Sequence, residues 1–325
     1  FSLFRRYSAL RRFASQYSMR VFRGLSQSSP SATVLTIGNF DGVHLGHRAL
    51  LARLCAVAGE TGVLPAVLTF EPHPREFFAP ESAPTRLSNL REKLELIAAD
   101  GVELAFVARF NKAFASLTAD QFIEDVLVKT LRVRHLIIGD DFRFGARRTG
   151  DFALLQQAGD SFGFRVEAMS TVASAEVRVS SSAVRDALWA GDLERAAELL
   201  GRPYVIDGRV VHGDKVGRQL GYATANIRMK HDRPPLLGVF AVEVTGLDGK
   251  TLPGVANLGY RPTANAVVRP ILEVHLFDFA ADIYGAHLTV RFLHKIRNEM
   301  KFSGFDELKT QIARDVETAR QYFKL

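Results

Sequence analysis

Residues 36–47 read Thr-Ile-Gly-Asn-Phe-Asp-Gly-Val-His-Leu-Gly-His, and they decide the fold that we expect for the first half of the chain. The apolar residues 34–37 predict a strand, and a helical pattern begins near Gly46. Between them lies a glycine-rich bend that carries His44 and His47. A strand, a glycine turn and a helix N-terminus leave free backbone N–H groups that favour an anion. The pattern predicts a nucleotide-phosphate site, although two solvated histidines on a capped helix would give the same spacing.

Strands and helices alternate around this segment. We expect strands at residues 34–37, 64–70, 103–107 and 135–138, and helices at residues 46–60, 88–101, 118–127 and 151–159. This alternation predicts an α/β domain, a Rossmann-like parallel sheet with helices on both faces. Ligands of such sheets bind beyond the carboxyl ends of the strands, where loops 38–42, 71–74 and 139–145 are expected.

The second half of the chain has a different pattern. After Pro203, short β-rich runs separated by Gly and Pro turns occur at residues 205–211, 238–244, 254–258, 271–278 and 288–293. They predict an antiparallel barrel or sandwich, followed by an amphipathic helix over Phe305–Phe323. We place the domain boundary near residues 186–203, with domains at 19–187 and 203–325 and a linker helix at 188–202.

Composition limits the classes of protein that fit. A chain of 325 residues with 47% apolar and 24% charged residues is typical of a soluble protein with two domains. Its single cysteine, Cys55, excludes an internal disulfide and fits the reducing cytoplasm. No apolar run reaches the roughly 18 residues that span a membrane.

The net charge of +7 does not indicate a nucleic-acid partner. Residues 1–18 contain four arginines and no acidic residue, so most of the excess lies in this opening stretch. We expect residues 1–18 to be an extension outside the fold. The true start could be Met19, or the stretch could be a mitochondrial presequence.

Three further stretches of the first half carry candidate site residues. His73 lies between two prolines, and Asp141 and Arg143 lie between glycines in residues 139–145. Residues 180–185 read Ser-Ser-Ser-Ala-Val-Arg at a predicted helix start, where hydroxyls, free N–H groups and Arg185 suit a polyphosphate. A connector, a long turn and a serine N-cap are the plain alternatives.

In the second half, Gly213 and Gly217 lie in a glycine-rich segment that allows close approach of the backbone to a phosphate. Thr224 and Asn226 would face the same side of a strand, and their oxygens suit a Mg²⁺ that also binds water and nucleotide. Glu273 interrupts an apolar strand and is a candidate general base for a substrate hydroxyl. An ordinary hairpin and an outward-facing carboxylate are the alternatives.

These motifs carry a family resemblance. His-Leu-Gly-His at 44–47 with the serines and Arg185 resembles the HxGH nucleotidyltransferases, and the longer version with Phe-Glu-Pro-His-Pro at 70–74 and Gly-Asp-Asp-Phe-Arg-Phe-Gly at 139–145 resembles the prokaryotic bifunctional riboflavin kinase/FMN adenylyltransferases. The resemblance implies that the first domain joins FMN to the AMP part of ATP. It implies that His44 and His47 act at the α-phosphate and the leaving pyrophosphate, and that Ser181, Ser182 and Arg185 act at the β- and γ-phosphates. The nucleotide-binding candidates of the bend are Gly38, Phe40, Asp41 and Gly46, and the flavin-binding candidates are His73, Asp141 and Arg143.

The resemblance continues to residue 325. Gly-Tyr-Ala-Thr-Ala-Asn at 221–226 is similar to the family's kinase motif, which implies a six-stranded antiparallel barrel that phosphorylates riboflavin with ATP. It also implies that Thr224 and Asn226 position Mg²⁺·ATP and that Glu273 activates the ribityl hydroxyl. Ala223 stands where the family usually has proline, which makes the segment before Thr224 less rigid.

Three other interpretations compete with this two-step synthesis of FMN and FAD from riboflavin. One keeps a single activity, with the other domain serving as a flavin-binding regulator. Another is a nucleotidyltransferase that acts on a pantetheine or cytidylyl acceptor, which the kinase-like motifs after residue 205 disfavour. The third is an RNA-associated protein that uses residues 1–18, for which the composition gives the weakest support.

Overall fold

The computed structural model describes residues 19–169, 173–174, 177–213, 217, 220–230, 233–247, 249–262 and 268–325. The chain divides into two compact units. The first unit consists of the residues up to Pro84 together with Leu90–Ser180. The second unit consists of Thr85–Asn89 together with Ser181–Leu325. The predicted extension, residues 1–18, lies outside the described residues.

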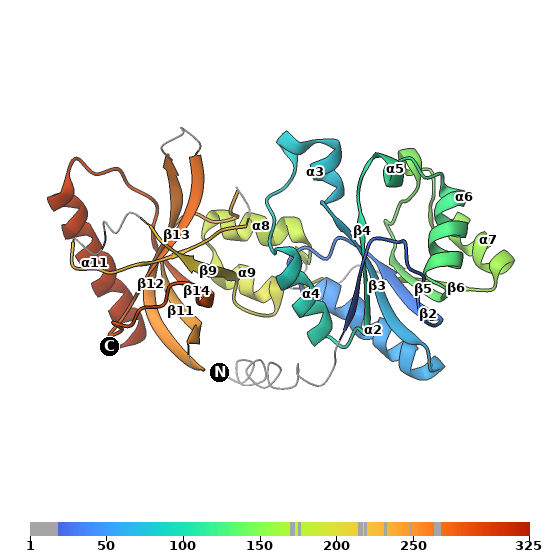
Figure 1. Cartoon of the computed structure of the whole chain (residues 1–325), viewed down its shortest axis with the longest axis horizontal. Helices are drawn as coiled ribbons and strands as arrows, with labels where there is room; N and C mark the ends of the chain where they lie inside the picture. The colour runs from blue at the N-terminus through green and yellow to red at the C-terminus, as the bar shows by residue number, and fades with distance from the viewer. Residues whose placement is uncertain are drawn as a thin grey trace. The chain divides into compact units, whose positions relative to one another are not determined.

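The first unit contains a six-stranded parallel sheet (Figure 1). The strands of the sheet are β1 (Arg20–Arg23), β2 (Thr33–Ile37), β3 (Leu64–Glu71), β4 (Leu104–Arg109), β5 (Val133–Gly139) and β6 (Arg165–Met169). A separate two-stranded ribbon consists of β7 (Ala173–Ser174) and β8 (Val177–Arg178). The helices of the first unit are α2 (Leu45–Thr61), α3 (Pro74–Phe78), η1 (Pro80–Ser82), α4 (Leu90–Ala99), α5 (Lys112–Ala115), α6 (Ala119–Gln121), η2 (Phe122–Thr130), η3 (Ala146–Arg148) and α7 (Phe152–Phe162). The strand order β1-β4-β3-β2-β5-β6 places β2 and β3 at the centre.

Two apolar layers cover this sheet. On one face, Phe122 and Leu127 of η2 and Leu155 of α7 pack in a core with strand residues such as Leu35 and Leu68. On the other face, α2 and α4 pack against strand side chains such as Val34 and Val67, whose neighbours Leu35 and Leu68 belong to the first core. The period-two alternation along each strand therefore fills both cores. The predicted parallel sheet with helices on both faces is confirmed.

Side-chain caps fix several helix ends of the first unit. Thr118 and Gln121 form a capping box, with Gln121 N–H donating to Thr118 Oγ1 at 3.1 Å and Thr118 N–H donating to Gln121 Oε1 at 3.0 Å. Asp151 caps α7, whose first residue is Phe152. The edge strands β1 and β6 were not predicted, because both are short and their charged residues hide the apolar alternation.

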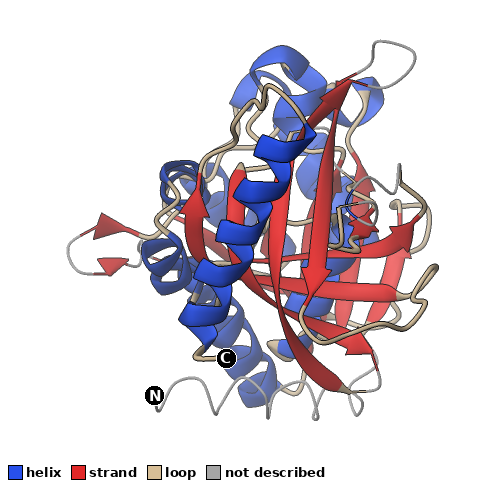
Figure 2. Ribbon diagram, turned by 90° about the vertical axis from the view of Figure 1, so that its left-hand side faces the viewer, coloured by secondary structure: helices blue, strands red, loops and turns tan. Residues whose placement is uncertain are grey.

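The second unit is built around a closed antiparallel barrel of order β10-β13-β12-β11-β14-β9 (Figure 2). Its elements are α8 (Ser181–Ala190), α9 (Leu193–Leu200), β9 (Val205–Val211), β10 (Ala225–Ile227), β11 (Gly238–Leu247), β12 (Lys250–Pro262), β13 (Val268–Leu276), β14 (His287–Arg297) and α11 (Phe305–Phe323). The predicted antiparallel barrel and its terminal helix are confirmed, and the helix has the expected bounds.

Two sets of helices complete the second unit. Figure 2 shows α11 lying along the barrel, where Val316 and Ala319 pack against Val239, Ala241 and Val255. The helices α8 and α9 also belong to this unit. The second unit therefore begins at Ser181, a few residues earlier in the sequence than the boundary expected at residues 186–203. Residues 188–202, which were expected to form a linker helix, lie within the second unit.

Candidate active sites

The bend between β2 and α2 lies at the carboxyl edge of the sheet. The N–H of Gly38 donates to the carbonyl of Leu68 at 3.0 Å, which ties the bend to β3. Phe40 has a positive φ of 49° although it is not glycine, and its side chain and that of Asp41 are buried. Such backbone conformations persist where the surrounding structure holds them, and they concentrate at functional sites.

His44 and His47 lie together, as the spacing predicts. His44 is the N-cap residue of α2, and its Nδ1 accepts the N–H of His47 at 3.3 Å. The two rings stack with centroids 3.7 Å apart. A Cβ at Gly46 would approach the His44 ring to 3.2 Å, so a glycine at this position lets the ring lie close to the helix. The pair forms a compact imidazole surface at the start of α2.

His47 is poised to remain neutral in the free protein. Its Nδ1 is buried and has no hydrogen-bond partner among the described residues. Burial lowers the pKa of His47 well below its usual value, and the nearby His44 and Lys93 lower it further. A bound phosphate would act in the opposite direction, because an anion favours the protonated ring.

The flavin-binding candidates of the first unit differ in exposure. His73 is buried and caps α3, its Nδ1 accepting the N–H of Arg75 at 3.1 Å. Asp141 is exposed and pairs with Arg178 at 2.9 Å, and the exposed Arg143 donates to the carbonyl of Phe142 at 2.9 Å. The structure therefore gives His73 a structural role as a cap, beside any contact with a ligand.

Sequence reasoning missed an aromatic cluster at the same edge of the sheet. Ring centroids lie 5.2–5.8 Å apart within a group that includes Phe70, Phe77, Phe78, Phe110 and Phe114. Phe70 and Phe110 lie at the ends of β3 and β4, and Phe78 is 67% exposed. The sequence signal was the two adjacent phenylalanines after the Pro-His-Pro segment, which the periodicity of the sheet does not require.

Ser181, Ser182 and Arg185 lie on α8, in the first two turns of a helix of the second unit. The Nε of Arg185 donates to the carbonyl of Thr85 at 2.6 Å. This bond links α8 to Thr85–Asn89, which belong to the same unit. The role of these three residues at the phosphates of ATP stays a prediction.

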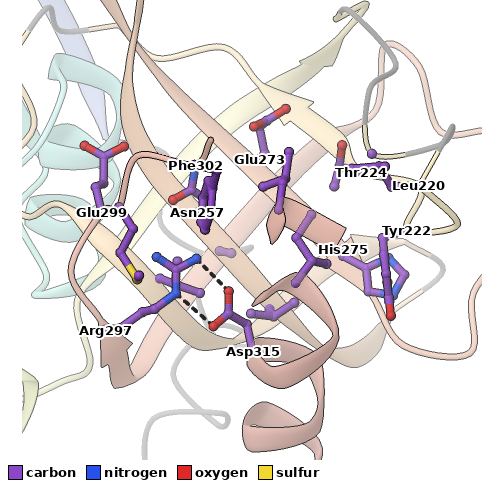
Figure 3. A pocket seen from close by; sticks show the side chains of 17 residues that line it. Leu220, Tyr222, Thr224, Asn257, Glu273, His275, Arg297, Glu299, Phe302 and Asp315 are labelled. Carbon is purple, nitrogen blue, oxygen red and sulfur yellow. Dashed lines mark hydrogen bonds and ion pairs between the residues drawn. The ribbon is translucent and has the colours of Figure 1, made fainter. Parts of the chain in front are cut away.

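A cavity of about 160 Å³ lies on the outer face of the barrel (Figure 3). Its walls come from β12, β13, the segment after β14, and α11. Glu273 and His275 line it, and the residues that alternate with them, Leu272 and Val274, are fully buried in the barrel. Glu273 therefore faces outward, as the alternative interpretation allowed, but α11 and the segment after β14 help to enclose the space around it.

Oxygen-bearing side chains form a row across three strands of this face. Strand register places Asn226 of β10 opposite Glu273 of β13, and Glu273 opposite Asn257 of β12. Paired residues of antiparallel strands project to the same face. Asn257 was not among the predicted site residues, because its place beside Glu273 depends on a register that the sequence does not reveal.

The two predicted phosphate-loop glycines contact the predicted metal-binding residues. A Cβ at Gly213 would collide with the side chain of Asn226, and a Cβ at Gly217 would collide with the carbonyl of Tyr222 and lie 3.2 Å from Thr224 Oγ1. Thr224 also lines a second cavity, of about 470 Å³, together with Asn226. Thr224 is thus a shared wall of two cavities, one of which contains Glu273.

The segment before Thr224 is anchored by a side chain rather than by proline. The Nδ1 of His275 lies 2.9 Å from the carbonyl oxygen of Ala223. The His275 ring also contacts Tyr222 edge-on, with centroids 5.5 Å apart. These contacts of His275 restrict the backbone at Ala223, the residue that replaces the proline of the family motif.

A buried ion pair forms the floor of the first cavity. Arg297 donates to both carboxylate oxygens of Asp315, at 2.8 and 2.7 Å, as the dashed lines in Figure 3 show. The pair joins the end of β14 to α11, and Gln311 also donates to Asp315 at 2.9 Å. Burial raises the pKa of the Glu299 carboxyl, which lines the same cavity. Arg297, Asp315 and Glu299 were not among the predicted site residues.

The two units together define a two-domain ATP-dependent transferase, with a nucleotidyltransferase-type sheet and a kinase-type barrel. Comparison with known proteins is specific. The family model of FAD synthetase matches residues 26–183, and that of riboflavin kinase matches residues 200–323. The chain belongs to the bifunctional riboflavin kinase/FMN adenylyltransferase family.

Relatives with this name match nearly the whole chain. The protein of Escherichia coli K12 is 53% identical over 310 residues, covering 94% of this chain and 99% of the relative. That of Haemophilus influenzae is 49% identical, with 94% and 99% covered. A crystal structure described as a macrolide-efflux protein from Streptococcus pneumoniae has a TM-score of 0.79 at 30% identity, covering 92% of this chain and 98% of that one. Among the described residues, no helix combines the length and apolar character that crossing a membrane requires.

Proposed function

We propose that each unit of this riboflavin kinase/FMN adenylyltransferase carries out one ATP-dependent step. In the second unit, the terminal ribityl hydroxyl of riboflavin attacks the γ-phosphorus of ATP, which gives FMN and ADP. In the first unit, a phosphate oxygen of FMN attacks the α-phosphorus of a second ATP, which gives FAD and pyrophosphate. Both are displacements at phosphorus, for which alignment and charge stabilisation supply most of the catalysis.

The observation that carries the kinase assignment is the position of Thr224 between two cavities. The cavity with Glu273 would take riboflavin, and the larger cavity with Asn226 would take ATP. The transferred phosphoryl group would then pass beside Thr224. Glu273, which lines the same cavity as Thr224 and lies opposite Asn226 in the strand register, is our candidate to accept the proton of the attacking hydroxyl.

Mg²⁺ is the metal that the oxygen-bearing side chains of this face fit. The part of the chain that the structure describes contains no cluster of three His, Cys, Asp or Glu residues that could hold a metal. Thr224 and Asn226 offer neutral oxygens, which suits an ion held mainly by ATP phosphates and water. When bound, Mg²⁺ neutralises phosphate charge. The protein's own residues orient ATP and remove the proton.

In the first unit, we assign the phosphates of ATP to the bend after β2. Gly38, Phe40, Asp41 and Gly46 place backbone groups around the start of α2, where the helix dipole favours an anion. His44 and His47 would donate to the α-phosphate and to the leaving pyrophosphate. Ser181, Ser182 and Arg185 are proposed for the β- and γ-phosphates from the family resemblance.

The aromatic cluster is our candidate platform for the isoalloxazine ring of FMN. It lies at the carboxyl ends of β3 and β4, where α/β sheets bind ligands, and Phe78 offers an exposed ring for stacking. His73 at the start of α3, and Asp141 and Arg143 after β5, border the same edge of the sheet. We place the protein in the cytoplasm, which its single, half-buried thiol supports.

The test follows flavins by chromatography after mixing the protein with riboflavin, ATP and Mg²⁺. FMN should rise first and then give way to FAD, and chelation of Mg²⁺ should stop both steps. With His47→Ala, FMN should accumulate while FAD formation falls about 10²- to 10³-fold, as for loss of one electrostatic donor. FAD formation at the wild-type rate by His47→Ala would contradict the role of His47. Failure to convert either flavin would contradict the two-step assignment.

A further inference from the structure

Lys93 is a buried lysine of α4, outside the predicted site residues of the first unit. Its side chain is fully buried, with no exposed surface. Burying an ammonium group costs several kcal/mol unless polar groups compensate for the lost water. A methionine of similar length would fill the same volume without this cost. Packing alone therefore does not account for a lysine at this position.

The contacts of Lys93 lead to the bend after β2. Its Nζ donates to Oγ1 of Thr69, on the central strand β3, at 3.4 Å. The hydroxyl of Thr69, itself fully buried, donates to the carbonyl of Asn39 at 3.3 Å. Asn39 precedes Phe40 and Asp41 in the bend. A helix, a strand and the bend are thus joined through polar groups that the core would otherwise exclude.

The second connection is electrostatic. The charges of His44 and Lys93 both lower the pKa of His47, in addition to burial. In the free protein, burial and these two neighbours disfavour a positive charge on His47. When ATP binds, its phosphates favour the protonated ring, so His47 can gain a proton while the anion is present.

We propose that Lys93 is a positioning residue for adenylyl transfer, which holds the bend 38–41 through Thr69 and supplies a fixed positive charge near the His44–His47 pair. The inference rests on the proposed role of His47. It predicts two separable effects of Lys93, one on the geometry of the bend and one on the protonation of His47. Because Lys93 is fully buried, it acts through these neighbours.

The test uses the full-length protein with FMN and ATP as substrates, and NMR titration of the His47 ring. Lys93→Met removes the ammonium group at nearly constant volume. We expect kcat for FAD formation to fall roughly 10- to 100-fold, as for a small misplacement of reacting groups. The KM values should change less, and the pKa of His47 should rise while staying below its ordinary value, because burial still lowers it. Riboflavin phosphorylation by the same molecule should stay at the wild-type rate.

Two variants separate the effects. Thr69→Val keeps the charge but removes the link to Asn39, so kcat should fall while the pKa of His47 stays low. Lys129→Met removes an exposed lysine that pairs with Asp125 at 2.7 Å, and both readouts should stay unchanged. If Lys93→Met does not fold, Lys93→Arg and Thr69→Val still test the charge and the link, since arginine should keep the pKa of His47 low.

The outcomes distinguish the inference from the assignment on which it rests. Loss of FAD formation in His47→Ala together with wild-type kinetics and an unchanged His47 pKa in Lys93→Met would overturn the role of Lys93 alone. Full activity of His47→Ala would overturn the proposed site itself. A fall in kcat for Lys93→Met with no change in the pKa of His47 would overturn the electrostatic part and leave the link through Thr69.

Discussion

The imidazole pair of the first unit comes from residues 44–47, whereas the row of Asn226, Asn257 and Glu273 in the second unit comes from three strands. In the first unit, one helix start fixes the geometry, through an N-cap bond and a ring stack. In the second unit, barrel closure and strand register fix it. A local site is therefore specified by its own residues, and a dispersed site is only as well ordered as the packing that holds its strands.

The largest expected effect concerns Glu273, the proposed base of the kinase site in the second unit. Glu273→Gln keeps the shape of the side chain but removes the base, so riboflavin phosphorylation should fall about 10²- to 10⁴-fold. FAD formation from added FMN should be unchanged, and both rates can be followed by flavin chromatography. Glu299→Gln is the matched control, because it alters another carboxyl of the same cavity that our mechanism does not use. Equal losses in both variants would contradict Glu273 as the base.

A second prediction concerns the ion pair below that cavity. Asp315→Asn leaves the Arg297 charge with a neutral partner in a buried site, and breaking such pairs costs about 3–5 kcal/mol of folding free energy. The unfolding temperature of the second unit should drop, as followed by fluorescence of Trp189, the single tryptophan. Asp278→Asn, which breaks the exposed pair with Arg320, should have little effect. A similar drop in both variants would show that burial of the Arg297–Asp315 pair is unimportant.

A smaller effect is expected at His275, whose contact with Ala223 stands in for the proline of the family motif. His275→Phe keeps an aromatic ring beside Tyr222 but removes the contact with the carbonyl of Ala223. We expect the KM for Mg²⁺·ATP in the kinase step to rise several-fold, because loss of one hydrogen bond is worth roughly 1 kcal/mol. Adding Ala223→Pro to this variant should restore part of the loss. No change in the single variant would contradict the anchoring role.

The smallest effect concerns pH and the local site. The pKa of His47 is lowered in the folded protein, so the unfolded state binds more protons below the ordinary histidine pKa of about 6.5. The first unit should therefore be fully stabilised above that pH and lose stability as pH falls below it. Amide hydrogen exchange of β2 and β3 between pH 5 and 8 measures this. His47→Phe should weaken the pH dependence without abolishing it, since burial also lowers the pKa of His135.

Much of the fold was predictable because its signals are local. The helix Phe305–Phe323, the capping box of Thr118 and Gln121, and the cap at Asp151 depend on neighbours three or four residues apart. The edge strand β1 was missed because its four residues include Arg20 and Arg23, which hide any apolar alternation. Closure of the barrel, unlike the presence of its strands, was available only through the family resemblance.

The same distinction holds for the candidate sites. The pairing of His44 with His47 could be predicted, since three residues along a helix start bring side chains together. Asn257 could not, because its position opposite Glu273 depends on the register of two long strands. Lys93 was missed for another reason: a lysine in a helix of mixed composition usually faces water, and its burial follows from how α4 packs against the sheet.

The topology of the two units also affects how each would behave when partly unfolded. The closed barrel pairs every one of its strands on both sides, so it offers no free edge to another chain. Among the described strands, β1 and β6 are the edges of the first unit's sheet, and each pairs with one neighbour only. Charges on these short strands, at Arg20, Arg23 and Arg165, oppose pairing with another chain. Aggregation on heating should therefore begin in the first unit, and replacing these arginines with valine should accelerate it.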